Sequence, residues 1–135
     1  MKKLIIFLFA LALLASAHAF QSDVYQNKAS AKPDSLAITK GDSTEYELIV
    51  FDPGFHSWFI SNRKPVWYHG NEYYRTKNSL YTTYWNIRVH ENMHRPPYDF
   101  EIVYDPTVDY GIEVNWQLFW YFKYLGQKYN IRLGP

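Results

Sequence analysis

The most prominent hydrophobic feature of the chain is an unbroken apolar run near its N-terminal end. Lys2 and Lys3 precede this run, which extends from Leu4 to Ala15, and the small residues of Ala17-His18-Ala19 follow it. A charged, an apolar and a small-residue region in this order predict a secretory signal peptide over residues 1–19. The run is shorter than the roughly 20 apolar residues that span a bilayer, so we expect no transmembrane anchor after cleavage.

The pattern changes after the predicted cleavage point. Residues 20–44 are rich in Ser, Ala, Lys, Asp and Gln, show no periodic apolar positions, and contain Pro33 and Gly41. This composition is typical of a flexible leader. We therefore expect one globular domain over residues 45–135.

Short runs in the domain carry strand and turn signals. Residues 46–51 (YELIVF) are β-branched and apolar, which predicts a strand. Asp52-Pro53-Gly54 then predicts a turn, and residues 55–60 predict one or two helical turns. Residues 101–104 predict a second short strand, and residues 131–133 a third at the sheet edge.

Two longer segments repeat apolar side chains at spacings of three and four residues, which is typical of helices. The first runs from Asn71 to about His90, and Pro96-Pro97 prevents its continuation. The second runs from about Asp109 to Tyr129 and is apolar around nearly its whole circumference, as in a helix at the centre of a fold. The pattern therefore predicts an α+β fold, in which two or three short strands pack against two long helices and the C-terminal helix is central.

The composition and charge of the chain exclude several kinds of site and partner. The chain has no cysteine, which excludes disulfides, thiolate metal sites and a lipid anchor on an N-terminal cysteine. Removing residues 1–19 also removes Lys2 and Lys3, so 12 basic and 13 acidic residues remain, with a net charge of −1 when His is neutral. There is no basic surplus to neutralise phosphates, so we expect no nucleic-acid partner.

One segment resembles a catalytic motif, since His90-Glu91-Asn92-Met93-His94 matches H-E-x-x-H. On a helix, the two imidazoles share a face and can bind zinc, while Glu91 can take a proton from zinc-bound water. Glu113, on the next predicted helix, would supply a third ligand. However, Arg95-Pro96-Pro97 should end the helix at His94. A catalytic zinc site, adventitious surface metal binding and a solvated helix end all stay open; the last is favoured, and no cofactor is expected.

The other signal is the aromatic content, which is 20% of the residues. Exposed Trp and Tyr rings can stack on sugars, hold peptide partners or meet a membrane interface. For most of these rings the favoured alternative is that they form the core. Candidates for a binding surface adjoin polar residues in the sequence; they are Trp58, Trp67, Tyr68, Tyr73, Tyr74 and Trp85.

Long stretches of the domain also resemble a known family. The stretches are YELIVFDPGFHSWFISNRKPVWYHGNEYYRTKNSLYTTYWN and YDPTVDYGIEVNWQLFWYFKYLGQKYNIRL, and the likeness covers about residues 45–133. They resemble a family of small exported bacterial proteins classed as a domain of unknown function. The resemblance implies export and a role in the cell envelope, and it supplies no catalytic or binding residues. The resemblance also implies that some relatives are lipoproteins, from which this cysteine-free chain would depart.

Together these features favour a non-enzymatic binding or structural domain in the bacterial periplasm or outside the cell. It would contact an envelope component or a partner protein through an aromatic surface. The alternative class is a small zinc-dependent hydrolase that uses residues 90–94.

Overall fold

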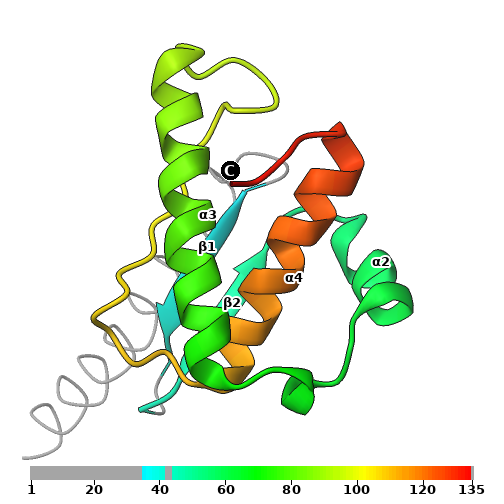
Figure 1. Cartoon of the computed structure of the whole chain (residues 1–135), viewed down its shortest axis with the longest axis vertical. Coiled ribbons are helices and arrows are strands. Elements are labelled where there is room, and N and C mark those ends of the chain that lie inside the picture. Colours follow the sequence, from blue (N-terminus) through cyan, green and yellow to red (C-terminus); the bar gives the residue numbers. More distant parts are fainter. Residues whose placement is uncertain (1–34, 42–43, 135) are drawn as a thin grey trace, which may run out of the picture. The chain divides into compact units, whose positions relative to one another are not determined.

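The computed structural model describes residues 35–41 and 44–134. The predicted signal peptide (residues 1–19) and residues 20–34 of the predicted leader lie outside these ranges. In chain order the elements are β1 (Leu36–Lys40), β2 (Tyr46–Val50), α2 (Phe55–Asn62), the 3-10 helix η1 (Val66–Tyr68), α3 (Asn71–Glu91) and α4 (Ile112–Tyr129) (Figure 1). The fold is α+β, as predicted. None of the helices in the described ranges has both the length and the apolar character needed to cross a bilayer.

The two strands form an antiparallel hairpin, with Leu36 opposite Val50 and Lys40 opposite Tyr46. The prediction of a flexible leader up to residue 44 is therefore wrong for β1, which is part of the sheet. The strand is only five residues long and lies among polar residues, so its apolar alternation is too brief to stand out. Leu48 of β2 is buried, and β2 contacts α4.

Helix α2 follows a turn that the sequence predicts. The Asp52 carboxylate accepts a hydrogen bond from the backbone N–H of Gly54 at 2.9 Å, which closes the turn before the helix. Phe55 and Phe59 are the buried residues of α2. Phe55 packs edge-on against Tyr121 of α4 with ring centroids 5.3 Å apart, so this short helix covers one side of α4.

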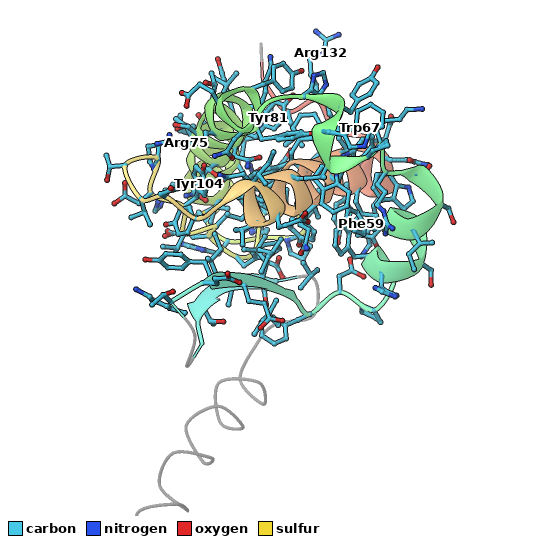
Figure 2. The ribbon with its side chains drawn as sticks, turned by 90° about the horizontal axis from the view of Figure 1, so that it is seen from below. Phe59, Trp67, Arg75, Tyr81, Tyr104 and Arg132 are labelled. Carbon is cyan, nitrogen blue, oxygen red and sulfur yellow. The ribbon has the colours of Figure 1, made fainter. Side chains whose placement is uncertain are left out.

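Helices α3 and α4 lie side by side and run in the same direction (Figure 1). Near their N-terminal ends, Asn115 donates to the side-chain oxygen of Asn71 at 2.9 Å. Near their C-terminal ends, the Arg88 guanidinium donates to the carbonyl of Arg132. Figure 2 shows α4 at the centre, with Phe59 on one side and Tyr104 on the other. The prediction of a central C-terminal helix is thus confirmed.

Helix α4 begins three residues later than the predicted start at Asp109, because Gly111 takes a positive φ of 83°. This conformation belongs to the loop and is tolerated by glycine.

Residues 92–111, here called the return segment, lead from the end of α3 back to the start of α4. The predicted strand at residues 101–104 is wrong, because this stretch has no strand partner among the described residues. Its backbone is bound instead by side chains of α3. The Asn86 amide donates to the Ile102 carbonyl and accepts from its N–H, both at 2.9 Å, and Trp85 donates to the Phe100 carbonyl at 2.8 Å. The predicted edge strand at residues 131–133 is likewise not formed.

Candidate functional site

The described part of the chain exposes its aromatic side chains at one place. The described aromatic residues with high exposure are Trp67, Tyr68 and Tyr73, with 76%, 53% and 40% of their surface accessible. Trp67 and Tyr68 belong to η1, and Tyr73 belongs to the first turn of α3. Together with His69 they form what we call the aromatic surface.

Three rings of the aromatic surface, those of Tyr68, His69 and Tyr73, pack against one another. His69 stacks on Tyr73 with ring centroids 3.9 Å apart and an interplanar angle of 26°. Tyr68 meets His69 edge-on at 4.7 Å. Beneath them, the buried Phe119 of α4 lies 5.9 Å from the Tyr73 ring, so the surface is a continuation of the core.

Two buried side chains hold the backbone that carries these rings. The Tyr74 hydroxyl donates to the Val66 carbonyl at 3.2 Å and accepts from the His69 N–H at 3.3 Å, so it bridges both ends of Trp67-Tyr68. Burial raises the pKa of Tyr74, which keeps this hydroxyl protonated. Trp116 adds a 2.9 Å hydrogen bond to the Lys64 carbonyl just before η1. The loop is therefore fixed before any ligand arrives.

Polar and charged side chains surround the aromatic surface. Residues 61–65 (SNRKP) and Glu72 are exposed. The Lys77 ammonium lies 5.8 Å from the centroid of the Tyr73 ring. Exposed aromatic rings and hydrogen-bonding groups are thus close to one another.

The other aromatic candidates have structural roles. Tyr74 and Trp85 are fully buried, so their prediction as surface residues is wrong. Trp58 is half-buried, with its indole N–H 2.9 Å from the side-chain oxygen of Gln127 and its ring against Trp120 and Tyr124. Each of these rings lies on a helix face that packs on α3, α4 or the return segment.

The H-E-x-x-H residues do not lie on a continuous helix. Helix α3 ends at Glu91, and Met93 and His94 take positive φ angles of 50° and 55°. The His94 N–H still bonds the Val89 carbonyl at 3.0 Å, which folds the chain back over the helix end. His90 and His94 therefore come together through a turn, not through one helix face.

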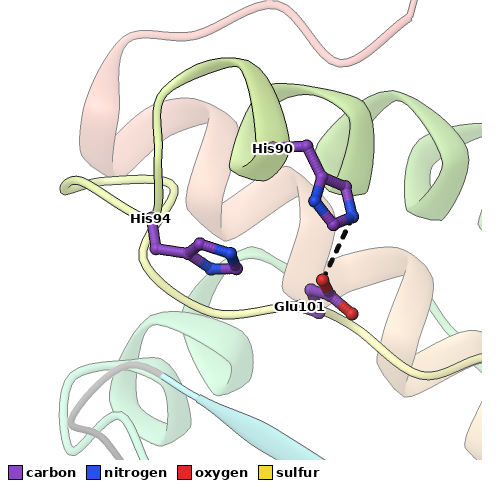
Figure 3. A group of neighbouring side chains, drawn as sticks. All are labelled: His90, His94 and Glu101. Atoms are coloured by element: carbon purple, nitrogen blue, oxygen red, sulfur yellow. Dashed lines mark ion pairs between the residues drawn. The ribbon is translucent and has the colours of Figure 1, made fainter.

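A carboxylate from the return segment joins these two histidines (Figure 3). His90 Nε2 lies 3.1 Å from Glu101 Oε1. The ligand atoms of His90, His94 and Glu101 all lie within 4.8 Å of one another, and all three residues are exposed. We call these residues the His–Glu cluster.

Glu113, the predicted third ligand, is not a member of this cluster. It lies in the first turn of α4 and lines a cavity with residues 44–46 and 109–112. Because α3 and α4 are parallel, the start of α4 lies beside the start of α3, away from His90. Glu91, the predicted base, is exposed at the last position of α3.

Two residues of these sites were missed by the sequence reasoning. His69 adjoins Tyr68 in the sequence, and that adjacency could have included it in the aromatic surface. Glu101 follows His94 across Pro96-Pro97, and no motif spacing connects the two. Only the path of the return segment brings Glu101 to the helix end.

Among known proteins, the chain matches a family model but no individual curated protein or solved structure. A family model described as "Family of unknown function (DUF6146)" matches residues 3–135. No curated protein and no solved structure matches the chain.

Proposed function

We propose that this chain, which belongs to the family of unknown function DUF6146, is exported to the cell envelope and is a non-enzymatic binding domain. Its ligand would lie on the aromatic surface. The observation that carries this proposal is the 76% exposure of Trp67 in a domain that fully buries Trp85.

The arrangement of the aromatic surface supports a role in recognition. A single exposed apolar residue is ordinary in any protein. Here the exposed Tyr68 and Tyr73 pack on His69, and the exposed Trp67 adjoins Tyr68 in the chain. Hydrogen bonds from the buried Tyr74 and Trp116 side chains hold their loop. A preorganised loop reduces the entropy lost on binding, which supports a role in contact with a ligand.

The surrounding chemistry favours a glycan of the envelope. A sugar ring has an apolar C–H face, which stacks on Trp or Tyr, and a rim of hydroxyls, which need hydrogen-bonding partners. The Lys77 ammonium lies 5.8 Å from the centroid of the Tyr73 ring, and the exposed Lys64 and Glu72 are close in the sequence to Trp67 and Tyr73. A protein interface core would favour a wider apolar patch with few charges.

The alternative of a zinc-dependent hydrolase has less support. Its motif requires both histidines on one helix face, with the glutamate beside the metal. Here α3 ends before His94, and Glu113 lies near the start of α4.

Export is tested by the N-terminus of the protein in its own cells. The chain should be recovered from the periplasm or the medium, and N-terminal sequencing should start at Phe20. A chain that keeps residues 1–19 and stays in the cytoplasm would refute export.

Binding is tested by co-sedimentation with purified cell-wall polysaccharide from the same cells. The wild type should sediment with the polysaccharide, and Trp67→Ala should abolish this co-sedimentation. Val103→Ala is the matched control, because Val103 is 80% exposed and lies on the return segment. If the wild type stays in solution, the glycan is the wrong ligand; if both variants bind like the wild type, the aromatic surface is the wrong site.

A further inference from the structure

We propose that His90, His94 and Glu101 bind one zinc ion, which ties the return segment to the C-terminal end of α3. The proposal concerns a different part of the molecule from the aromatic surface and does not depend on it. Two imidazoles and a carboxylate are ligands that zinc takes in proteins, commonly with water in the fourth position.

The distances within the His–Glu cluster are close to those of a zinc site. Metal–ligand bonds of 2.0–2.2 Å in a tetrahedron place ligand atoms about 3.4 Å apart. His90 Nε2 and Glu101 Oε1 are already 3.1 Å apart, and the whole set lies within 4.8 Å. Small rotations of these exposed side chains would bring His94 to bonding distance.

The position of His94 is not explained by the ion pair alone. His90 and Glu101 can pair without a third partner, yet His94 has its ring centroid 5.8 Å from that of His90 at an interplanar angle of 78°. The turn that places it has two consecutive non-glycine residues at positive φ. A shared metal gives this third side chain a role that an ion pair does not.

The local field also suits a cation. His90 lies in the last turn of α3, where the helix dipole gives the helix end a partial negative charge. Glu101 adds a carboxylate at the same point. His90 lies at the helix end, and His94 and Glu101 lie at two points of the return segment, so one ion would link the helix end to both.

The experiment is calorimetric titration of zinc chloride into the full chain, purified without a polyhistidine tag, with stoichiometry from native mass spectrometry. The wild type should bind one zinc per chain, and zinc should raise its melting temperature. His94→Ala is the decisive variant, because it removes a ligand and leaves the His90–Glu101 pair intact. Loss of a partner that only orients a ligand costs 10–100-fold in affinity, so loss of His94 should weaken binding by at least about tenfold.

Two carboxylates provide a matched comparison. Glu101→Gln should weaken zinc binding like His94→Ala, whereas Glu91→Gln should leave it unchanged. All of these side chains are exposed, so circular dichroism of each zinc-free variant should match the wild type. The proposal is overturned if the wild type binds no zinc, if His94→Ala binds as tightly as the wild type, or if Glu91→Gln weakens binding and Glu101→Gln does not.

Discussion

Asp52 is a buried carboxylate, and removing its charge should destabilise the domain more than removing an exposed one. Its side chain is 3% exposed, and Oδ2 lies 2.8 Å from the ammonium of Lys128, which is 30% exposed. Oδ1 accepts the Gly54 N–H at 2.9 Å. The Tyr124 hydroxyl also hydrogen-bonds this carboxylate.

The expected magnitude lies between two limits. Breaking a fully buried pair costs about 3–5 kcal/mol, while an exposed pair is worth about 0–1 kcal/mol. Since Lys128 retains access to water, we expect Asp52→Asn to lower the free energy of unfolding by about 2 kcal/mol. In Asp52→Asn the side-chain amide oxygen can still accept the hydrogen bond from the Gly54 N–H. Asp52→Ala loses this bond as well, so it should cost about 1 kcal/mol more than Asp52→Asn.

The assay is urea unfolding at pH 7, followed by tryptophan fluorescence and circular dichroism. Lys128→Met removes the partner charge, and the double variant with Asp52→Asn should cost about 1 kcal/mol less than the sum of the single changes. Glu72→Gln is the control, because Glu72 pairs with Arg75 at 3.2 Å and Arg75 is as exposed as Lys128, but Glu72 itself is 81% exposed. Equal and small losses for Asp52→Asn and Glu72→Gln would refute the argument from burial.

Two further predictions concern pH and the return segment. Burial raises the pKa of Tyr104 and of Tyr124 from 10.0 to about 12. Their contribution to stability should therefore be complete below pH 10 and lost as the pH rises to about 12. Urea unfolding across this range should show the decrease in the free energy of unfolding, and Tyr124→Phe should make that decrease smaller. Asn86→Ala should lower the free energy of unfolding by about 1–3 kcal/mol, because the N–H and the carbonyl of Ile102 both lose their hydrogen-bond partner. The control Asn92→Ala removes one exposed hydrogen bond to the Arg88 carbonyl and should cost less than about 0.5 kcal/mol in the same assay.

The helices could be predicted from the sequence because their signal is long. Helix α3 repeats its apolar positions over many turns, and the predicted range differs from the observed one by a single residue at its end. Helix α4 is apolar on more than one face, which predicted its central place correctly. Strand β1 was missed because it is only five residues long, so its apolar residues Leu36, Ala37 and Ile38 do not stand out from the polar stretch around them.

The details that define the sites depend on the tertiary path of the chain. Residues 101–104 have the side chains of a strand, but the sequence does not say whether a strand or the amide of Asn86 will pair with them. Trp67 and Trp85 are the same residue type, and only the path of the return segment, whose Tyr98 and Phe100 pack on Trp85, decides which of the two is buried. Glu101 likewise reaches His90 only because the return segment passes the end of α3.

The parallel arrangement of α3 and α4 also constrains how the chain can fold. Antiparallel neighbouring helices pair through a short turn, but here residues 92–111 must first run back along α3 before α4 can pack against it. Closing that loop costs entropy before the helix contacts form. The bonds from Trp85 and Asn86 to residues 100–102 shorten the part of the loop that remains free. We therefore expect α3 to bind the return segment first and α4 to dock later, with slower folding than in a helical bundle of local contacts.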